Sequence, residues 1–519
     1  MVTLLTELTA PSTNVSVILP ELVVAAAGVI VMLYDSFVPK QRAITGAISI
    51  VALVTAGVLL ANLWVSGVPA TSWGGMIAND NLRISFSFVF IFVTLITVLV
   101  STIWVERENV PVGEYHALLL FATFGMMMMS AGNDLVVIFL GLETSSIATY
   151  VMAGMRKGDL KSNESSMKYF ILGSFASAFL LYGMALVYGA TGSTNISRIA
   201  ALFNSPDHSV NFPALLLVGG AMMIVGFGFK IALAPFHVWT PDVYEGAPTP
   251  ITGFMAAGPK SAAIASFLRV FVLGFPLVSG VAASIYLHES WISALSVLAM
   301  ITIIFGNVAA VMQNNVKRML AYSSIAHAGY AMVGFVGAGL AKDALSRDAA
   351  IASVAFYMVT YAVTNLGAFG IVTLLAQKND RRADFDDYNG IGFKAPALSF
   401  SLSLFMLSLL GLPLTAGFMG KVLVFGPALS ANNPLVTLLV VVAVIGSAIS
   451  AYYYLRLVVV MFFRERVTDW VSPRIPAGLA MALVITVLGV LYFGIFASGT
   501  IERFSHQPGT ADSYASIEK

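Results

Sequence analysis

Four lysines stand inside long apolar stretches of this 519-residue chain, where a charged side chain is costly. They are Lys168, Lys230, Lys260 and Lys421. Placing a lysine at the centre of a membrane-spanning helix costs roughly 2.5–3.5 kcal/mol on insertion scales. One acid, Glu143, lies in a similar stretch, IFLGLETSSIATY. These residues indicate a role that needs buried charge, although Lys168 lies close enough to a helix end for its side chain to reach the membrane surface.

Proton transfer is the chemistry that suits these residues. Burial lowers the pKa of a lysine because desolvation disfavours the ammonium, and a nearby carboxylate raises it again. A lysine whose acidic partner moves is therefore a proton switch, and Glu143 with Lys230 is the natural pair. His237 and His327 lie beside polar breaks, and histidine relays protons near neutral pH. A buried histidine is as often a hydrogen-bonded packing residue, so both interpretations stay open.

The composition indicates that the elements holding these residues cross a membrane. Hydrophobic residues make up 58% of the chain and charged residues 10%, against roughly 25% charged in soluble domains. The formal net charge of +1 gives no electrostatic footprint for a nucleic acid. The absence of cysteine excludes iron–sulfur clusters held by cysteines of this chain, and we expect no cofactor on it. We predict an all-α polytopic membrane protein whose surroundings are the lipid bilayer.

The apolar stretches set the number of membrane helices, because about 20 apolar residues are needed to cross a bilayer. We predict about fourteen helices, at residues 17–35, 42–65, 82–104, 115–132, 134–155, 166–190, 213–236, 249–274, 290–312, 318–340, 349–376, 396–428, 434–463 and 476–497. The chain is predicted to form a single membrane domain over residues 1–519, in which residues 1–114 supply the first three helices.

Helices seven and twelve of this series are discontinuous, since they contain Pro235 and Pro413. Proline removes a backbone donor and clashes with the preceding turn. In lipid the freed carbonyl groups must be met by protein or water, so broken helices usually line a cavity. Matching breaks favour two inverted repeats, at residues 115–274 and 290–463, with 476–497 as a last helix. Two unrelated proline kinks are the alternative.

The loop charges predict the orientation. Lysine and arginine are concentrated in the loops that follow odd-numbered helices, which places these loops in the cytoplasm. An even number of helices then puts both termini on the outer, periplasmic side. The longest hydrophilic stretch, residues 377–394, mixes charges of both signs and is predicted to be a solvated connector.

One segment, KIALAPFHVWTPDVYEGAPTPITGFMAAGPKSAA at residues 230–263, resembles the antiporter-like subunits of respiratory complex I, the bacterial NADH–quinone oxidoreductase. The resemblance covers nearly the whole chain in order. It continues in GNDLVVIFLGLE (132–143), NESSMKYFILGSFASAFLLYGMALVYGATGS (163–193), KRMLAYSSIAHAGY (317–330) and GLPLTAGFMGKVLVF (411–425). The blocks MKYFILGSFAS and AAGPKSAA favour the N type of subunit over the related L and M types.

The resemblance implies that the chain moves protons and which residues carry them. The implied proton-transfer residues are Glu143, Lys168, Lys230, Lys260 and Lys421, with weaker support for His237 and His327. Glu143 is implied to pair with Lys230, Lys260 to relay protons at the centre, and Lys421 to end a second half-channel. Fourteen helices with two inverted five-helix repeats are implied as well.

The same resemblance implies partners and a location. FMN, iron–sulfur clusters and quinone would be held by partner subunits, and M-like and K-like subunits would be the membrane neighbours. The implied location is the bacterial cell inner membrane. Three alternatives stay open: a subunit of a multi-subunit cation/proton antiporter, a subunit of a related redox complex with another electron donor, and a scaffold that pumps nothing. The buried lysines argue against the scaffold, which would avoid their cost.

Overall fold

The computed structural model describes residues 13–38, 42–66, 71–204, 213–277, 282–380, 382–466 and 473–505, and it is predominantly helical. Its first α-helices are α1 (Val15–Phe37), α2 (Arg42–Val65), α3 (Asn81–Glu108), α4 (Val112–Ala131), α5 (Leu135–Ala153), α6 (Leu160–Thr191), α7 (Ile196–Asn204), α8 (Pro213–Ile231), α9 (Thr240–Gly246) and α10 (Thr249–Phe267), which a π-helix, η2 (Leu268–Leu273), extends. The rest are α11 (Ala282–Val311), α12 (Val316–Gly339), α13 (Ala344–Leu375), α14 (Ile391–Lys394), α15 (Pro396–Leu410), α16 (Ala416–Ser430), α17 (Pro434–Phe463), α18 (Ala477–Ile495) and α19 (Ala497–Ser505).

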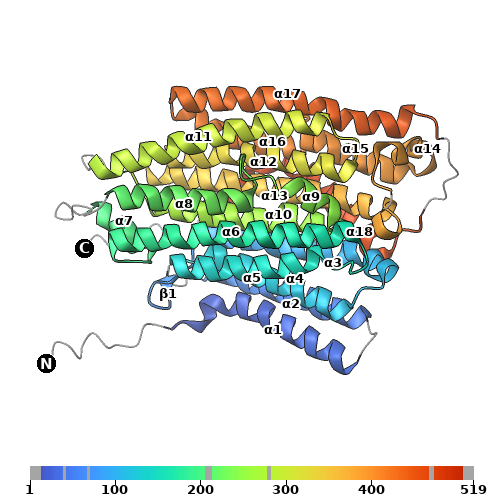
Figure 1. Ribbon diagram of the computed structural model, residues 1–519, viewed down its shortest axis with the longest axis horizontal. Helices are drawn as coiled ribbons and strands as arrows, with labels where there is room; N and C mark the ends of the chain where they lie inside the picture. Colours follow the sequence, from blue (N-terminus) through green and yellow to red (C-terminus); the bar gives the residue numbers. More distant parts are fainter. Residues whose placement is uncertain are drawn as a thin grey trace.

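Small elements complete the described chain. Two short strands, β1 (Thr71–Ser72) and β2 (Ile77–Ala78), pair antiparallel. Two 3-10 turns, η3 (Lys378–Asp380) and η4 (Phe385–Tyr388), follow α13. Figure 1 shows α14 near one end of the bundle, and β1 with α7 at the other. Both chain termini, for which the loop charges predict a periplasmic location, lie outside the described residues.

Thirteen helices of the described chain are long and apolar enough to cross a membrane. They are α1, α2, α3, α4, α5, α6, α8, α10 with η2, α11, α12, α13, α17 and α18. The predicted twelfth helix is instead two shorter apolar helices, α15 and α16, separated by a break. The predicted all-α polytopic fold is therefore confirmed, including its discontinuous helices.

Three helices form the centre of the bundle. Helices α10, α12 and α13 are almost entirely buried, whereas only 33–39% of the apolar stretch is buried in α1, α2, α6, α17 and α18. In Figure 1 the central helices lie between α1 at one edge and α17 at the opposite edge. Both lipid and protein core are apolar, so a spanning helix does not need one polar face. The central helices are therefore the place where a buried polar side chain is shielded from lipid by other helices.

The prediction that residues 377–394 form a solvated connector is wrong for part of this segment, although Asp384 and Asp386 are exposed. The rings of Phe385 and Tyr388 in η4 are buried, and the Asp380 carboxylate in η3 is only 4% exposed. Charged side chains of both signs in a loop indicate that the loop is exposed to solvent only when these side chains do not pair with residues of other elements. Here the partners of Asp380 come from other elements, which the local composition does not show.

Candidate functional site

The first helix break lies directly after Lys230. Helix α8 ends one residue beyond this lysine, Ala232 turns the chain with φ of 67°, and the chain becomes helical again in α9. The indole Nε1 of Trp239 donates to the Phe229 carbonyl oxygen at 3.0 Å. A side chain of the break thus satisfies a carbonyl that the ending helix leaves open.

The Lys230 ammonium is surrounded by neutral groups. Its Nζ donates to the Ser146 hydroxyl at 2.9 Å and to the Tyr169 hydroxyl at 3.1 Å, and it lies 5.0 Å from the centre of the Tyr169 ring. The lysine is 4% exposed. Helices α5, α6 and α8 therefore converge on this amine.

Glu143, the expected partner of Lys230, interacts with it electrostatically but lies beyond ion-pair distance. Among the described residues the Oε1 atom of Glu143 has no hydrogen-bond partner. Glu143 precedes Ser146 by three residues, so both lie on one side of α5. The structure thus places the expected acid near the lysine without joining the two.

Lys260 lies in the middle of α10 and is 1% exposed. Its Nζ donates to the carbonyl oxygen of Ser324 at 2.8 Å and to the hydroxyl of the same residue at 2.5 Å. Ser324 belongs to α12, so this lysine connects two of the three central helices. Its partners are again neutral.

Lys421 lies in α16, and its side chain reaches back to the second break. Gly411 ends α15 in the left-handed region, with φ of 94°. The Lys421 Nζ donates to the carbonyl oxygens of Leu409 and Leu410 at 3.1 and 2.7 Å, and to the Ser447 hydroxyl at 2.7 Å. The last carbonyls of a helix carry partial negative charge and favour a cation. The break therefore supplies the groups that hold this ammonium.

His327 lies on α12 among hydroxyls. Its Nδ1 is 2.7 Å from the Tyr357 hydroxyl, and its Nε2 is 3.2 Å from the Tyr454 hydroxyl. It also interacts electrostatically with Lys260 and with Lys421. This histidine is therefore near both amines, as a relay between them would need to be.

His237 has a different setting in the first break. Its ring packs on Phe305 with centroids 4.4 Å apart, and its Nδ1 has no hydrogen-bond partner within the described part of the chain. The ring is buried. Its role in proton transfer stays a prediction.

Lys168 is not a member of the buried group. Its side chain is 39% exposed and forms ion pairs with Glu164 at 2.6 Å and with Asp242 at 2.7 Å. Asp242 lies in α9, the short helix after the first break. The geometry therefore connects Lys168 to the position of α9.

Further ion pairs hold α9 in place. Arg318 of α12 donates to Asp242 at 2.8 Å and to Glu245 at 2.9 Å, and Lys161 of α6 donates to Glu245 at 2.9 Å. Burial raises the pKa of both carboxyls, but the cations beside them outweigh burial and hold each pKa below its ordinary value. Both acids of α9 are therefore anions that tie it to α6 and α12.

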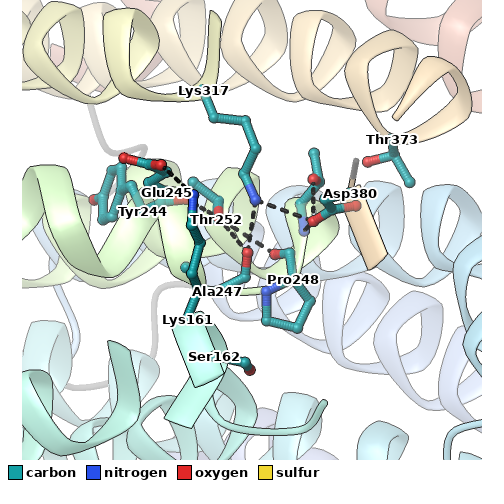
Figure 2. Close-up of polar contacts among 12 residues, drawn as sticks. Lys161, Ser162, Tyr244, Glu245, Ala247, Pro248, Thr252, Lys317, Thr373 and Asp380 are labelled. Atoms are coloured by element: carbon teal, nitrogen blue, oxygen red, sulfur yellow. Dashed lines mark hydrogen bonds and ion pairs between the residues drawn. The ribbon is translucent and has the colours of Figure 1, made fainter. Parts of the chain in front are cut away.

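A second charged group, which the sequence analysis missed, centres on one buried carboxylate. We name it the Asp380 cluster; its members are Asp380, Arg107, Arg156, Lys317 and Thr249. The Lys317 Nζ lies 3.0 Å from a carboxylate oxygen of Asp380, the Arg156 guanidinium 3.1 Å and the Arg107 guanidinium 3.6 Å. The Thr249 hydroxyl donates to the same carboxylate at 2.8 Å. Figure 2 shows Lys317 reaching both Asp380 and the carbonyl of Ala247.

Electrostatics keep the Asp380 carboxylate ionised. Burial raises the pKa of Asp380, but Lys317 and Arg156 lower it more, so that it stays below its ordinary value. Asp380 also lines a cavity of about 960 Å³, together with Arg156, Lys161 and Glu245. Two members of the cluster, Asp380 and Arg156, therefore form a charged part of the cavity wall.

The residues missed by sequence reasoning are the neutral partners and the Asp380 cluster. Ser146 could have been found, because it follows Glu143 by three residues on a helix. Ser324 and Asp380 carry no local signal, since their partners come from other elements. Among the described residues no three histidine or acidic side chains are grouped to hold a metal ion.

Comparisons with known proteins agree with this geometry. The sequence profile of the NADH:quinone oxidoreductase/Mrp antiporter transmembrane family matches residues 132–450. NADH-quinone oxidoreductase subunit N of Trichlorobacter lovleyi is 42% identical, with 95% of this chain and 96% of the relative covered. NADH-quinone oxidoreductase subunit N 1 of Solibacter usitatus is 41% identical, over 93% of this chain and 95% of the relative.

Solved structures give the same picture. A chain of respiratory complex I from Thermus thermophilus with bound aureothin superposes with a TM-score of 0.76 at 33% identity, covering 93% of this chain and 99% of that chain. A chain of the Mrp complex from Dietzia has a TM-score of 0.78 at 19% identity, covering 95% and 97%. The second likeness concerns the fold alone.

Proposed function

Because this chain belongs to the NADH–quinone oxidoreductase subunit N family of antiporter-like, proton-translocating membrane subunits, we propose that its three buried lysines carry the protons. We name Lys230, Lys260 and Lys421 the core lysines. The observation that supports the proposal most directly is that all three amines have hydrogen bonds to neutral oxygens alone. A buried ammonium without a paired carboxylate is poorly compensated, so it gives up its proton more readily than a paired one.

The three lysines divide between the two halves of the chain. In the proposed route, Lys230 belongs to a first repeat at residues 115–274 and Lys421 to a second repeat at residues 290–463. Lys260 hands the proton on through His327, which interacts with both Lys260 and Lys421.

Glu143 is the proposed trigger. A shift of its carboxylate toward Lys230 would favour the ammonium, and a shift away would favour proton release. The present geometry, near but unpaired, is compatible with such movement. For Lys168 we propose that it acts by holding α9, because its ion pairs with Glu164 and Asp242 keep it charged.

The setting follows from the family. We propose that quinone reduction, with FMN and iron–sulfur clusters in partner subunits, drives these shifts, and that M-like and K-like subunits are the membrane neighbours. The end of the bundle with the Asp380 cluster would face the cytoplasm, because lysine and arginine gather in the loops there. Both termini would then be periplasmic, in the bacterial inner membrane.

A cation/proton antiporter is the second candidate, since the matched family includes Mrp subunits. Relatives above 40% identity over most of the chain carry the complex I name, which favours redox-driven pumping. Exchange of cations for protons by this chain without NADH or quinone would reverse that preference.

The test replaces each core lysine by alanine in the assembled complex. We expect Lys230→Ala, Lys260→Ala and Lys421→Ala each to lower NADH-driven proton uptake into proteoliposomes, by about 10²-fold or more for the protons that pass through this chain. Lys394→Ala is the matched control, because Lys394 is exposed in the short helix α14. Full pumping by all three core variants in complexes of normal composition would defeat the proposal.

A further inference from the structure

The step from Lys230 to Lys260 is the part of the proposed route that no hydrogen bond between described residues completes. Lys230 ends on the hydroxyl of Tyr169 in α6, and Lys260 ends on the hydroxyl of Ser324 in α12. Each lysine therefore already has a hydroxyl that could pass a proton on. A third group is needed between the two hydroxyls.

Tyr244 belongs to α9, which packs against both α6, the helix of Tyr169, and α12, the helix of Ser324. It interacts electrostatically with Tyr169, and its hydroxyl is near that of Ser324. The side chain is 1% exposed, yet within the described ranges its hydroxyl has no partner at hydrogen-bonding geometry. Leaving a buried hydroxyl unpaired costs about 1–3 kcal/mol, so such a group calls for an explanation.

The position of Tyr244 is fixed from several sides. The Trp239 ring stacks on Tyr169 with centroids 4.4 Å apart and packs edge-on against Tyr244 at 5.9 Å. The Tyr244 carbonyl accepts a hydrogen bond from Thr252 at 2.9 Å. Figure 2 shows Tyr244 beside Glu245, with Thr252 on the other side of Glu245.

The ion pairs of α9 restrain the same segment. Asp242 and Glu245 flank Tyr244 in sequence and are held by Lys168 and Arg318. Movement of this tyrosine therefore requires movement of a charged helix that is tied to its neighbours. The break after Lys230 thus does more than end α8, since it places α9 and Tyr244 against α6, α10 and α12.

We propose that Tyr244 is the bridging residue for proton transfer from Lys230 to Lys260, an inference that rests on the proposed function. The ammonium of Lys230 gives its proton to the Tyr169 oxygen while the proton of that hydroxyl moves to Tyr244. The Tyr244 proton moves to Ser324, and the Ser324 proton moves to neutral Lys260. Each hydroxyl ends with one proton, Lys230 has lost one, and Lys260 has gained one.

The experiment compares Tyr244→Phe with Tyr388→Phe in the assembled complex. Phenylalanine keeps the ring packing and removes only the hydroxyl. Tyr388 is the matched control, because it too is a buried tyrosine whose hydroxyl lacks a partner in the described structure, and it lies in η4 outside the route. We expect Tyr244→Phe to reduce protons pumped per NADH as much as Lys230→Ala does, and Tyr388→Phe to leave the ratio unchanged.

A second variant covers the case in which Tyr244→Phe does not assemble. Ser324→Ala removes the next hydroxyl, while Lys260 keeps its 2.8 Å bond to the carbonyl of residue 324. The same pumping loss is expected, with no change in composition of the complex. A larger H2O/D2O ratio of pumping rates in any partially active variant would mark slowed proton transfer, which a purely structural defect would not produce.

The outcomes separate the two proposals. Undiminished pumping by Lys230→Ala would overturn the proposed function itself. A loss with Lys230→Ala but full pumping with both Tyr244→Phe and Ser324→Ala would overturn the bridge alone. Tyr361 also lies near Ser324, from α13, so a loss seen only in the double variant Tyr244→Phe/Tyr361→Phe would likewise overturn the assignment to Tyr244.

Discussion

Lys317 and Lys260 are two lysines with equal burial and opposite partners. Each is 1% exposed. The Lys317 amine lies 3.0 Å from the Asp380 carboxylate, whereas the Lys260 amine has hydrogen bonds to the carbonyl and hydroxyl of Ser324 alone. A carboxylate compensates a buried ammonium more fully than neutral oxygens do. The difference teaches that partners, and not burial, distinguish a structural lysine from one suited to exchange protons.

Three more lysines can be grouped by whether their partners are neutral or acidic. Lys230 and Lys421 have neutral partners, as Lys260 does, although their helices are broken and that of Lys260 is not. Lys168 has two carboxylates, as a lysine with a structural role would. The Asp380 cluster and the core lysines are therefore two kinds of region, one built to keep its charges and one to let them change.

Removing the carboxylate of the Asp380 cluster is expected to have the largest effect on stability. Asp380→Asn leaves Lys317 and Arg156 buried without that anion, which costs about 3–5 kcal/mol. The measurement is the midpoint of thermal unfolding of the purified complex, with assembly followed on native gels. Asp386→Asn is the control in the same segment, because the Asp386 side chain is 82% exposed. An unchanged midpoint for Asp380→Asn would remove the distinction between the two regions.

The stability difference between wild type and Asp380→Asn is expected to depend on pH in one direction. Burial raises the pKa of Asp380, but its cations lower it by more, so the folded value lies below the ordinary 3.8. A carboxyl with a lowered pKa stabilises the fold above its unfolded value and loses that contribution as the pH falls through the folded one. The difference in thermal midpoint between wild type and Asp380→Asn should therefore be constant from about pH 5 to 8. It should become smaller only below about pH 4. If the difference in thermal midpoint became smaller near neutral pH, this result would contradict the negative charge assigned to Asp380.

A paired substitution of the two lysines sharpens the comparison. Lys317→Met leaves Asp380 with one close cation fewer and is expected to destabilise the complex by about 3 kcal/mol. Lys260→Met removes a charge that has neutral partners alone, so its effect on stability should be near zero or favourable by about 1 kcal/mol. Proton pumping should show the reverse order, with the loss in Lys260→Met. Thermal midpoints and pumping assays on the same preparations measure both, and an equal destabilisation by the two variants would contradict the distinction.

The fold was largely predictable from the sequence because lipid imposes a simple constraint. A chain that must form all its backbone hydrogen bonds internally over about 20 apolar residues can adopt few structures other than a helix. The breaks at Pro235 and Pro413 follow because proline has no backbone N–H to donate. The core lysines were predictable for the same reason, since an ammonium in an apolar stretch is costly. Confirmed helices such as α2 and α17 begin and end where the apolar stretches do.

What could not be predicted depends on contacts between distant elements. Lys317 stands at the start of α12, where a lysine is unremarkable, and its partner Asp380 lies beyond the next membrane helix. The expectation that Glu143 pairs with Lys230 concerned two residues on different helices, and the distance between them depends on helix packing. The position of Tyr244 could not be predicted for the same reason. The fold of the chain after the break brings it near Ser324.

The smallest expected effect tests whether a neutral partner serves proton exchange or only position. Ser447→Ala removes one of three hydrogen bonds of the Lys421 amine, while the carbonyls of Leu409 and Leu410 still hold it. The loss of stability should be about 1 kcal/mol, the usual net value of one hydrogen bond. Ser430→Ala is the control, because the Ser430 hydroxyl is exposed and bonds within its own helix. If the hydroxyl takes part in exchange, proton pumping falls in Ser447→Ala although the thermal midpoint hardly moves. Unchanged pumping would mean that the two helix-end carbonyls suffice, and that Lys421 differs from Lys230, whose hydrogen bonds go to hydroxyls alone.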